Sequence, residues 1–178
     1  MEKSYLSIYA KSFNWAGLFL PKRTYLECSN LYDFCRTLDN IADDKSEIDI
    51  KLRRFLNFKN NFKNQEFQNS IIKNMWVLIN EYNISKKIVD DLFDGVESDI
   101  QKKVKLNSKK ELLIYSYRVA GTVGLMMAKI LNVTDSNSLK SAIDLGIAMQ
   151  LTNISRDVIE DYKNNRFYIK HDFETIRE

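Results

Sequence analysis

Residues 144–169 read DLGIAMQLTNISRDVIEDYKNNRFYI, and this stretch decides the fold. Its apolar residues recur at helical spacing, which predicts a helix packed against other helices. Within it, Asn153, Asp157 and Asp161 follow one another at intervals of four residues, so they share one face of the helix. Gln150 lies one turn before them. A polar stripe inside apolar sequence is costly unless it is solvated, paired or bound to metal.

A second stripe of the same kind occurs earlier in the chain, where residues 36–43 read RTLDNIAD. Asp39 and Asp43 are four residues apart and therefore share a helix face. Arg36 precedes Asp39 by three residues, and Tyr32 lies one turn further back. One helix face thus offers a phenol, a guanidinium group and two carboxylates beside apolar neighbours.

Two oxygen-rich stripes suit the activation of a diphosphate. Mg²⁺ prefers oxygen ligands and is typically held by one or two carboxylates together with substrate phosphates. Aspartate pairs facing each other across a bundle would hold such ions, and Arg36 or Arg156 would add forked donors for the phosphate oxygens. A lone aspartate pair on a helix is more often a solvated face with lysine partners. The spacing alone therefore leaves both interpretations open.

The composition narrows the chemistry. One Pro and five Gly among 178 residues favour long helices, and the formal charge of +3 is too small to indicate a nucleic-acid partner. His171 is the only histidine, which argues against histidine-based zinc and di-iron sites. Cys28 and Cys35 lie a heptad apart on one predicted helix, so we interpret them as reduced thiols of a cytoplasmic protein. The longest apolar run, Val119–Ala128, is too short to span a bilayer.

The hydrophobic pattern predicts helices along the whole chain, without a linker or a repeat. The expected helices cover about Tyr5–Phe19, Pro21–Asp43, Leu52–Phe62, 67–82, Ser85–Ile100, Ser108–Leu131 and Asn137–Tyr162. We therefore expect a single all-α domain over 1–178, in which the two polar stripes face a common cavity.

Four blocks of sequence resemble the phytoene and squalene synthase family. In chain order they are SFNWAGLFLP (12–21) with LYDFCRTLDNIADD (31–44), DLFDGVESDI (91–100), YSYRVAGTVGLM (115–126) and the opening stretch, 144–169. They cover nearly the whole chain. The last block resembles phytoene synthases more closely than squalene synthases. The resemblance implies an isoprenoid-synthase-like helical bundle around a central cavity. It also implies further helices after the last block, so we expect the chain to lack the family's C-terminal part.

The resemblance also implies a role for particular residues. Asp39, Asp43, Asp157 and Asp161 match the two aspartate-rich motifs that bind metal, with Asn153 as an added ligand and Tyr32 and Tyr115 beside the carbocation. Arg36, Arg156, Gln150, Lys11, Phe13 and Gly121 match positions that bind the diphosphate or border the prenyl pocket. The implied cofactor is Mg²⁺, with Mn²⁺ as the alternative, and no nicotinamide is expected. Asn40 stands where the family often has a third aspartate.

The implied reaction joins two geranylgeranyl diphosphates head to head through a cyclopropyl diphosphate intermediate, in carotenoid and isoprenoid biosynthesis. One alternative is a squalene or dehydrosqualene synthase that couples two farnesyl diphosphates. An alternative of another class is a non-catalytic helical partner that keeps the fold. A basic cluster, Lys102, Lys103, Lys105, Lys109 and Lys110, is either a solvated loop or a contact with the membrane surface. A downstream desaturase is a further partner that no residue pattern specifies.

Overall fold

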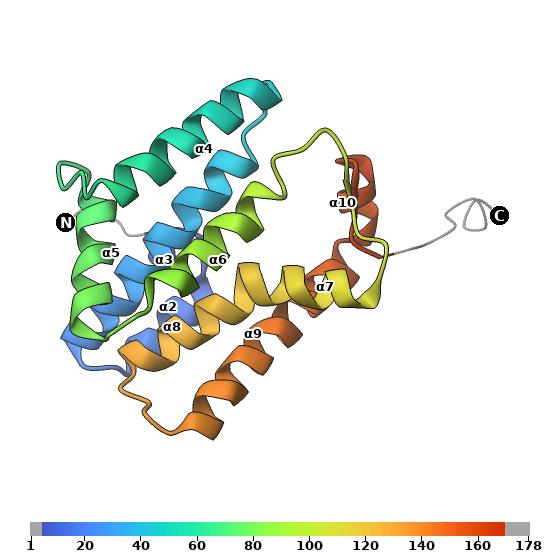
Figure 1. The fold of residues 1–178 in the computed structure, drawn as a ribbon. Helices are drawn as coiled ribbons and strands as arrows, with labels where there is room; N and C mark the ends of the chain where they lie inside the picture. The colour runs from blue at the N-terminus through green and yellow to red at the C-terminus, as the bar shows by residue number, and fades with distance from the viewer. Residues whose placement is uncertain (1–4, 170–178) are drawn as a thin grey trace.

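The computed structural model describes residues 5–169, which form a helical bundle with one short pair of strands (Figure 1). Its elements are α1 (Tyr5–Tyr9), α2 (Lys11–Gly17), α3 (Lys22–Ala42), α4 (Ile48–Lys63), α5 (Ser70–Glu81), α6 (Lys86–Glu97), β1 (Val104–Lys105), α7 (Lys109–Ser116), the π-helical η1 (Tyr117–Gly121), α8 (Thr122–Ile130), α9 (Ser136–Arg156), α10 (Val158–Lys163) and β2 (Arg166–Phe167). The all-α architecture expected from the sequence is confirmed.

Helix α3 lies at the centre of the main core, where it contacts α4, α5, α6 and α8. Pro21 is its N-cap residue, so the helix begins directly after the proline. Leu31, Phe34 and Leu38 are fully buried, and the ring of Phe93 from α6 packs edge-on against Phe34 at 5.8 Å between centroids. Burial of each such side chain contributes roughly 1.5–3 kcal/mol. This core fixes the direction in which the C-terminal end of α3 points.

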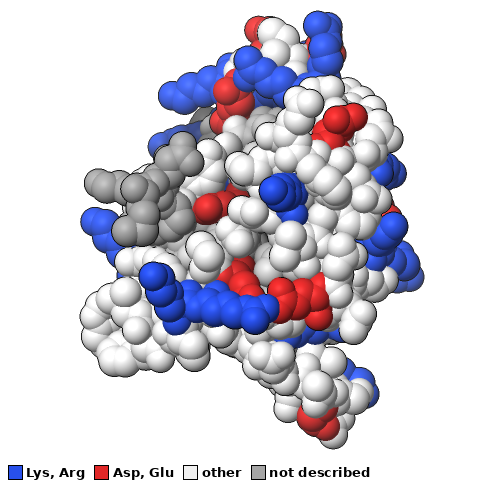
Figure 2. All heavy atoms as spheres, turned by 90° about the vertical axis from the view of Figure 1, so that its left-hand side faces the viewer, with Lys and Arg blue, Asp and Glu red and all other residues white. Residues whose placement is uncertain are grey.

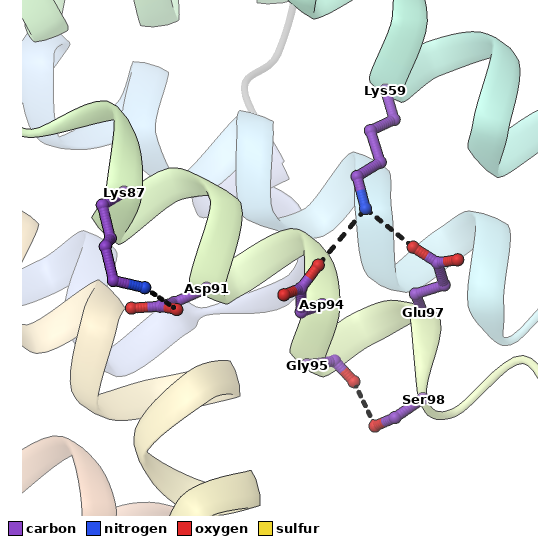
Figure 3. A network of polar contacts seen from close by, with 7 residues as sticks. All are labelled: Lys59, Lys87, Asp91, Asp94, Gly95, Glu97 and Ser98. Atoms are coloured by element: carbon purple, nitrogen blue, oxygen red, sulfur yellow. Dashed lines mark hydrogen bonds and ion pairs between the residues drawn. The ribbon is translucent and has the colours of Figure 1, made fainter.

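Helix α4 is tied to α6 by a lysine between two carboxylates (Figure 3). Lys59 Nζ lies 3.3 Å from Oδ1 of Asp94 and 2.8 Å from Oε2 of Glu97. The lysine side chain is 15% exposed, so these ion pairs are screened less than pairs on an open surface. A second pair on α6 joins Lys87 to Asp91 at 3.1 Å. The Lys59 contacts hold α6 against α4, and the C-terminal end of α6 supplies part of the cavity wall described below.

The helix expected over 108–131 contains a wider turn in its middle. Its start is capped by the Ser108 side chain, as predicted, but η1 separates α7 from α8. A Cβ on Gly95 of α6 would lie 2.7 Å from Cβ of Arg118 and 2.9 Å from Cγ1 of Val119, so α6 crosses the π turn at close range. Such turns insert one residue into a helix and are frequent at functional sites. Here the turn carries a residue of the cavity wall, Val119.

Helices α8 and α9 approach each other so closely that glycine is required at the crossing. A Cβ on Gly124 would lie 2.3 Å from the carbonyl oxygen of Ala142, and one on Gly146 would lie 2.4 Å from that of Ala120. Glycine inside a helix costs about 1 kcal/mol relative to alanine. The close packing of two backbones is the physical reason for both residues.

Three local features differ from the sequence-based expectation. The first helix is interrupted at Ala10, where φ is −118°. The helix expected to reach Tyr162 is divided at Asp157, whose φ and ψ are −100° and 11°. Strands β1 and β2, which the sequence did not predict, pair in parallel with Val104 opposite Arg166. The last two differences reshape the region around the cavity.

The surface agrees with the modest net charge. On the face drawn in Figure 2, Lys and Arg side chains are interspersed with Asp and Glu among a larger area of uncharged atoms. That face shows no continuous basic surface of the kind used to bind nucleic acid. Within residues 5–169, none of the helices is both long enough and apolar enough to cross a membrane.

Candidate active site

A cavity of about 230 Å³ lies between the C-terminal ends of α3 and α6, the α7–η1 segment and the junction of α9 with α10. Its polar lining comes from Asp39, Asp43, Asp99, Tyr115, Gln150, Asn153, Asp157, Asp161, Arg166 and Tyr168. Its apolar lining comes from Ala42, Val96, Val119 and Ile154. The cavity thus brings together both aspartate pairs, which are more than a hundred residues apart in the sequence.

The first aspartate pair, Asp39 and Asp43, stands at the end of α3. Asp43 is the C-cap residue of the helix, and its Oδ1 accepts a hydrogen bond of 2.8 Å from Arg166. Burial raises the pKa of Asp39 to about 6, with a further rise from the charge of Asp43, while Arg36 lowers it. Asp39 still keeps an exposed surface, because its side chain lines the open cavity although protein atoms surround it on the other sides. Asp39 therefore changes its protonation state only about one pH unit below neutral.

The second aspartate pair, Asp157 and Asp161, stands at the junction of α9 with α10. Asp157 accepts hydrogen bonds from Nε and Nη2 of Arg156, at 2.7 Å and 2.6 Å. This forked contact lowers the pKa of Asp157. Burial raises the pKa of Asp161 to about 6, although the charge of Arg166 opposes the rise. In both pairs, one aspartate binds an arginine and the other has a raised pKa.

A third carboxylate, Asp99, orders the wall between the two pairs. Its Oδ2 accepts a hydrogen bond of 2.7 Å from the Tyr115 hydroxyl, and its Oδ1 accepts one of 2.8 Å from the Tyr168 hydroxyl. The two tyrosine rings are stacked with 4.8 Å between their centroids. Burial and the charge of Asp99 raise the pKa of both phenols, so both remain protonated donors.

Six residues that the resemblance implied do not line the cavity: Tyr32, Arg36, Arg156, Lys11, Phe13 and Gly121. Lys11 and Phe13 are exposed on α2, and Phe13 keeps 57% of its surface accessible. Gly121 is buried at the contact with α9, where a Cβ would lie 3.2 Å from Ile143 and 3.3 Å from Ile147. Its small size allows this close packing of helices, and its place at the border of the prenyl pocket stays a prediction.

Tyr32 and Arg36 remain close to the first aspartate pair although they do not line the cavity. Both stand on α3, where Arg36 lies about one turn before Asp39 and Tyr32 about two turns before it. Burial raises the pKa of Tyr32, and the charges of Arg36 and Asp39 act on it in opposite directions. These two residues are therefore part of the electrostatic surroundings of Asp39.

The donor set of the cavity fits a hard divalent cation. The four carboxylates of the two pairs and the amide oxygens of Gln150 and Asn153 are oxygen ligands, which hard cations prefer. Within the described residues, no group of three or more His, Cys, Asp or Glu side chains is close enough to hold an ion by itself. That arrangement suits Mg²⁺, which is typically held by one or two carboxylates and completed by substrate phosphates.

Asp99, Arg166 and Tyr168 are the cavity residues whose place the sequence reasoning did not identify. Asp99 is far from both aspartate pairs in the sequence, so no spacing indicates its place beside them. Arg166 and Tyr168 follow Asn165, whose φ of 58° ends the helical region. A short alternation of polar and apolar residues after that turn was the available signal. His171 lies outside the described residues.

The comparisons with known proteins agree with this geometry. The family model described as squalene/phytoene synthase matches residues 6–172. A phytoene synthase of Pseudescherichia vulneris is 31% identical over 172 residues, covering 90% of this chain and 55% of the relative. A 4,4'-diapophytoene synthase of Staphylococcus haemolyticus (strain JCSC1435) is 32% identical over 165 residues, covering 90% and 58%. The chain thus spans little more than half the length of these relatives.

Two solved structures share the fold. A dehydrosqualene synthase in complex with ligand has a TM-score of 0.71 at 29% identity, over 97% of this chain and 61% of the other. A squalene synthase, HpnC, from Alicyclobacillus acidocaldarius has a TM-score of 0.76 over 91% and 61%, and its 18% identity shows the fold alone. The expected isoprenoid-synthase-like bundle is therefore confirmed. Because the family model matches nearly the whole chain, the protein belongs to the squalene/phytoene synthase family.

Proposed function

We propose that this protein is a head-to-head prenyltransferase of the phytoene synthase type, which condenses two geranylgeranyl diphosphates. The observation that carries the proposal is the meeting of the two aspartate pairs at one cavity with both a polar and an apolar lining. The similarity to proteins named phytoene synthase supports the same activity. An amphipathic substrate of this kind needs both types of wall.

The polar half of the cavity would bind the diphosphate. The two aspartate pairs would hold Mg²⁺, or Mn²⁺ as the alternative. The bound ions would neutralise the negative charge that develops on the departing diphosphate. Asn153 and Gln150 present amide groups from α9 on the same side as the second pair. Arg166 and Arg156 carry forked donors that suit phosphate oxygens. These residues would orient the substrate so that its C–O bond ionises inside the cavity.

The apolar half would hold the prenyl chain and exclude water from the cation. Val96, Val119 and Ile154 supply this wall. In the proposed coupling, the double bond of the second substrate attacks the cation of the first, and loss of a proton from the resulting cation closes the ring of a cyclopropyl diphosphate. A second ionisation, rearrangement and proton loss then give the hydrocarbon. The ring of Tyr115 borders the cavity, where an aromatic face attracts positive charge.

The hydrogen bonds of the tyrosines bear on which group accepts the final proton. The hydroxyls of Tyr115 and Tyr168 both donate to Asp99. A raised pKa keeps their protons in place, so neither phenol is ready to accept another. These contacts support the released diphosphate as the base.

Coupling of two farnesyl diphosphates is the second candidate. The 4,4'-diapophytoene synthase and the dehydrosqualene synthase among the similar proteins favour it, since their names denote the shorter product series. The two candidates share the polar half of the cavity and differ in the length of chain that the apolar half accepts. Neither coupling to phytoene nor coupling to its shorter analogue requires a nicotinamide.

Incubation of the protein with Mg²⁺ and either geranylgeranyl or farnesyl diphosphate tests the proposal, with product mass as the readout. A forty-carbon hydrocarbon from geranylgeranyl diphosphate is the expected result, and a thirty-carbon product would favour the second candidate. A protein that binds either diphosphate in the presence of Mg²⁺ without forming hydrocarbon would support the non-catalytic partner instead. Release of inorganic diphosphate measured in parallel separates the first ionisation from the complete coupling.

A further inference from the structure

Each aspartate pair has one carboxylate bound by an arginine, which is distant in the sequence for the first pair and is the adjacent residue for the second. In the first pair, Asp43 accepts a hydrogen bond from Arg166 of β2 at 2.8 Å. In the second pair, Asp157 accepts the fork of Arg156, the last residue of α9, at 2.7 Å and 2.6 Å. The same kind of contact therefore occurs in both aspartate pairs, although the two arginines belong to different elements.

Arg166 is the better anchored of the two arginines. Strand β2 is held to the segment around β1 by backbone hydrogen bonds of 3.0 Å, from Val104 to Asn165 and from Leu106 to Phe167. The Arg166 side chain is 22% exposed, whereas the Arg156 side chain is 67% exposed. Because solvent screens exposed pairs more strongly, the contact of Arg166 contributes more to the electrostatics of the cavity.

We propose that Arg166 and Arg156 are internal counter-ions, which bind Asp43 and Asp157 until a diphosphate draws both guanidinium groups away from the carboxylates. The inference rests on the proposed function, because it takes a divalent cation and a diphosphate as the ligands of the cavity. A guanidinium fork binds phosphate oxygens as well as it binds a carboxylate, so the transfer keeps the arginines paired. It also frees the two carboxylates at the moment when the diphosphate supplies further oxygen ligands.

A second observation points the same way. Within the described residues, the protein does not bring three acidic, histidine or cysteine ligands close enough to hold an ion. A cation entering alone would find few ligands and would have to displace an arginine from its carboxylate. A bound diphosphate would supply the missing oxygen ligands and would also bind the arginine in place of the carboxylate. The affinities for metal and for diphosphate should therefore strengthen each other, by the same factor in each direction.

Calorimetric titration of Mn²⁺ tests this inference without an activity assay. Mn²⁺ is titrated with and without inorganic diphosphate into the wild-type protein and into Arg166→Gln, Arg166→Lys and Arg54→Gln. Arg54 is the matched control, because it pairs with Asp44 at 3.4 Å and lies outside the cavity lining. Circular dichroism and a melting curve for each variant establish that it is folded.

In Arg166→Gln, we expect Mn²⁺ alone to bind about three- to fivefold more tightly than in wild type, the range of an ion pair of this exposure. Diphosphate should bind more weakly, and the enhancement of one ligand by the other should shrink. Arg166→Lys retains the charge, so it should stay closer to wild type in Mn²⁺ affinity. Should Arg166→Gln fail to fold, Arg156→Gln makes the same comparison at the second pair, with a smaller expected change.

Two results would overturn the inference, and they can be told apart. If Arg166→Gln binds Mn²⁺ no more tightly than Arg54→Gln and keeps the wild-type enhancement, the arginine does not compete with the metal, and the proposed function stands. If the wild-type protein binds neither Mn²⁺ nor diphosphate when both are present, the inference and the proposed function both fail.

Discussion

The two aspartates of each pair have opposite electrostatic surroundings. Asp43 and Asp157 accept hydrogen bonds from arginines, whereas burial raises the pKa of Asp39 and Asp161 to about 6. At neutral pH Asp39 and Asp161 are largely ionised, and their burial makes this ionisation costly, although the charges of nearby arginines reduce the cost. A bound cation would remove that cost. The same two carboxylates can therefore destabilise the protein without metal and bind the cation when it is present.

The raised pKa values predict how stability depends on pH without metal. The folded-state pKa of Asp39 and Asp161, about 6, lies above the ordinary value of 3.8. Their contribution to stability is therefore complete below about pH 4 and is lost as the pH rises through about 6. We expect the double variant Asp39→Asn, Asp161→Asn to melt higher than wild type at pH 7.5, with a gap that narrows towards pH 5.

Comparison with the double variant isolates this effect from other groups, such as Asp33 and Asp99, whose pKa values are also raised. Melting temperatures measured in chelator across pH 5–7.5 provide the data. A gap that stays constant or widens as the pH falls would contradict the assigned pKa values.

A single carboxylate of the second pair can be removed without a change of shape. Asp157→Asn keeps the size of the side chain and an oxygen that can accept from Arg156, but it loses the charge with which Asp157 would hold the proposed Mg²⁺. In an active protein we expect a loss of turnover of roughly 10²–10³-fold, the size seen when one charge-stabilising group is removed. The melting temperature without metal should change little, because the side chain is half-buried at the cavity edge.

Steady-state kinetics at limiting Mg²⁺ measure the loss for Asp157→Asn, and Asp135→Asn at the distant start of α9 is the control. Asp135 caps that helix and does not line the cavity. Unchanged turnover in Asp157→Asn would remove this residue from the site. A large drop in melting temperature would indicate a structural role instead.

At the scale of helices, the α8–α9 crossing is the tightest contact that bears on the site. A Cβ on Gly124 would lie 2.3 Å from the Ala142 carbonyl oxygen, a position that only backbone movement can relieve. We expect Gly124→Ala to destabilise the protein by about 1–3 kcal/mol, because overpacking outweighs the gain in helix propensity. Denaturant unfolding measures the change, with Ser141→Ala on the exposed face of α9 as the control. An unchanged or raised stability would mean that the two helices separate easily.

The same scale shows what the sequence could predict. Pro21 and the periodic apolar residues of α3 placed that helix within one residue of its observed ends, and with it the first aspartate pair. The second pair stands at the break between α9 and α10, not on one continuous helix face. Local sequence cannot encode the β1–β2 pair, because two-residue strands far apart in the chain leave no periodic pattern. The break of the last long helix at Asp157 likewise carries no Gly or Pro signal. Arg166 was missed because its place depends on both features.

At the scale of the whole molecule, the basic cluster around β1 is a set of exposed lysines, one of which contacts an aromatic ring of the protein itself. All five lysines are exposed, and Lys103 Nζ lies 4.9 Å from the ring centroid of Phe167. A cation at this distance from an aromatic face gains about 0.5–1 kcal/mol at an exposed site. The contact with anionic lipid stays a prediction, which sedimentation with vesicles of anionic and of neutral composition would test.

Among the described residues, the exposed apolar side chains include two sets, here called the first and the second surface. The first surface, on α2 and the turn after it, consists of Phe13, Trp15, Leu18 and Phe19, with Phe19 76% exposed. The second surface, on α9 and α10, consists of Leu145, Met149 and Ile159, with Ile159 69% exposed. Monomeric proteins rarely tolerate contiguous apolar patches beyond a few hundred Å². Exposure of this kind favours association with another apolar surface.

We therefore expect the 178-residue chain to self-associate as its concentration rises. Size-exclusion chromatography with light scattering over a hundredfold concentration range measures the mass, and Trp15→Ser with Phe19→Ser should shift it towards the monomer. Val77→Ser is the control, because this 51% exposed residue of α5 belongs to neither surface. A monomer at every concentration would show that these side chains rearrange or cover one another. If the control variant lowered the mass as much as the paired variant, the association would not depend on the α2 surface.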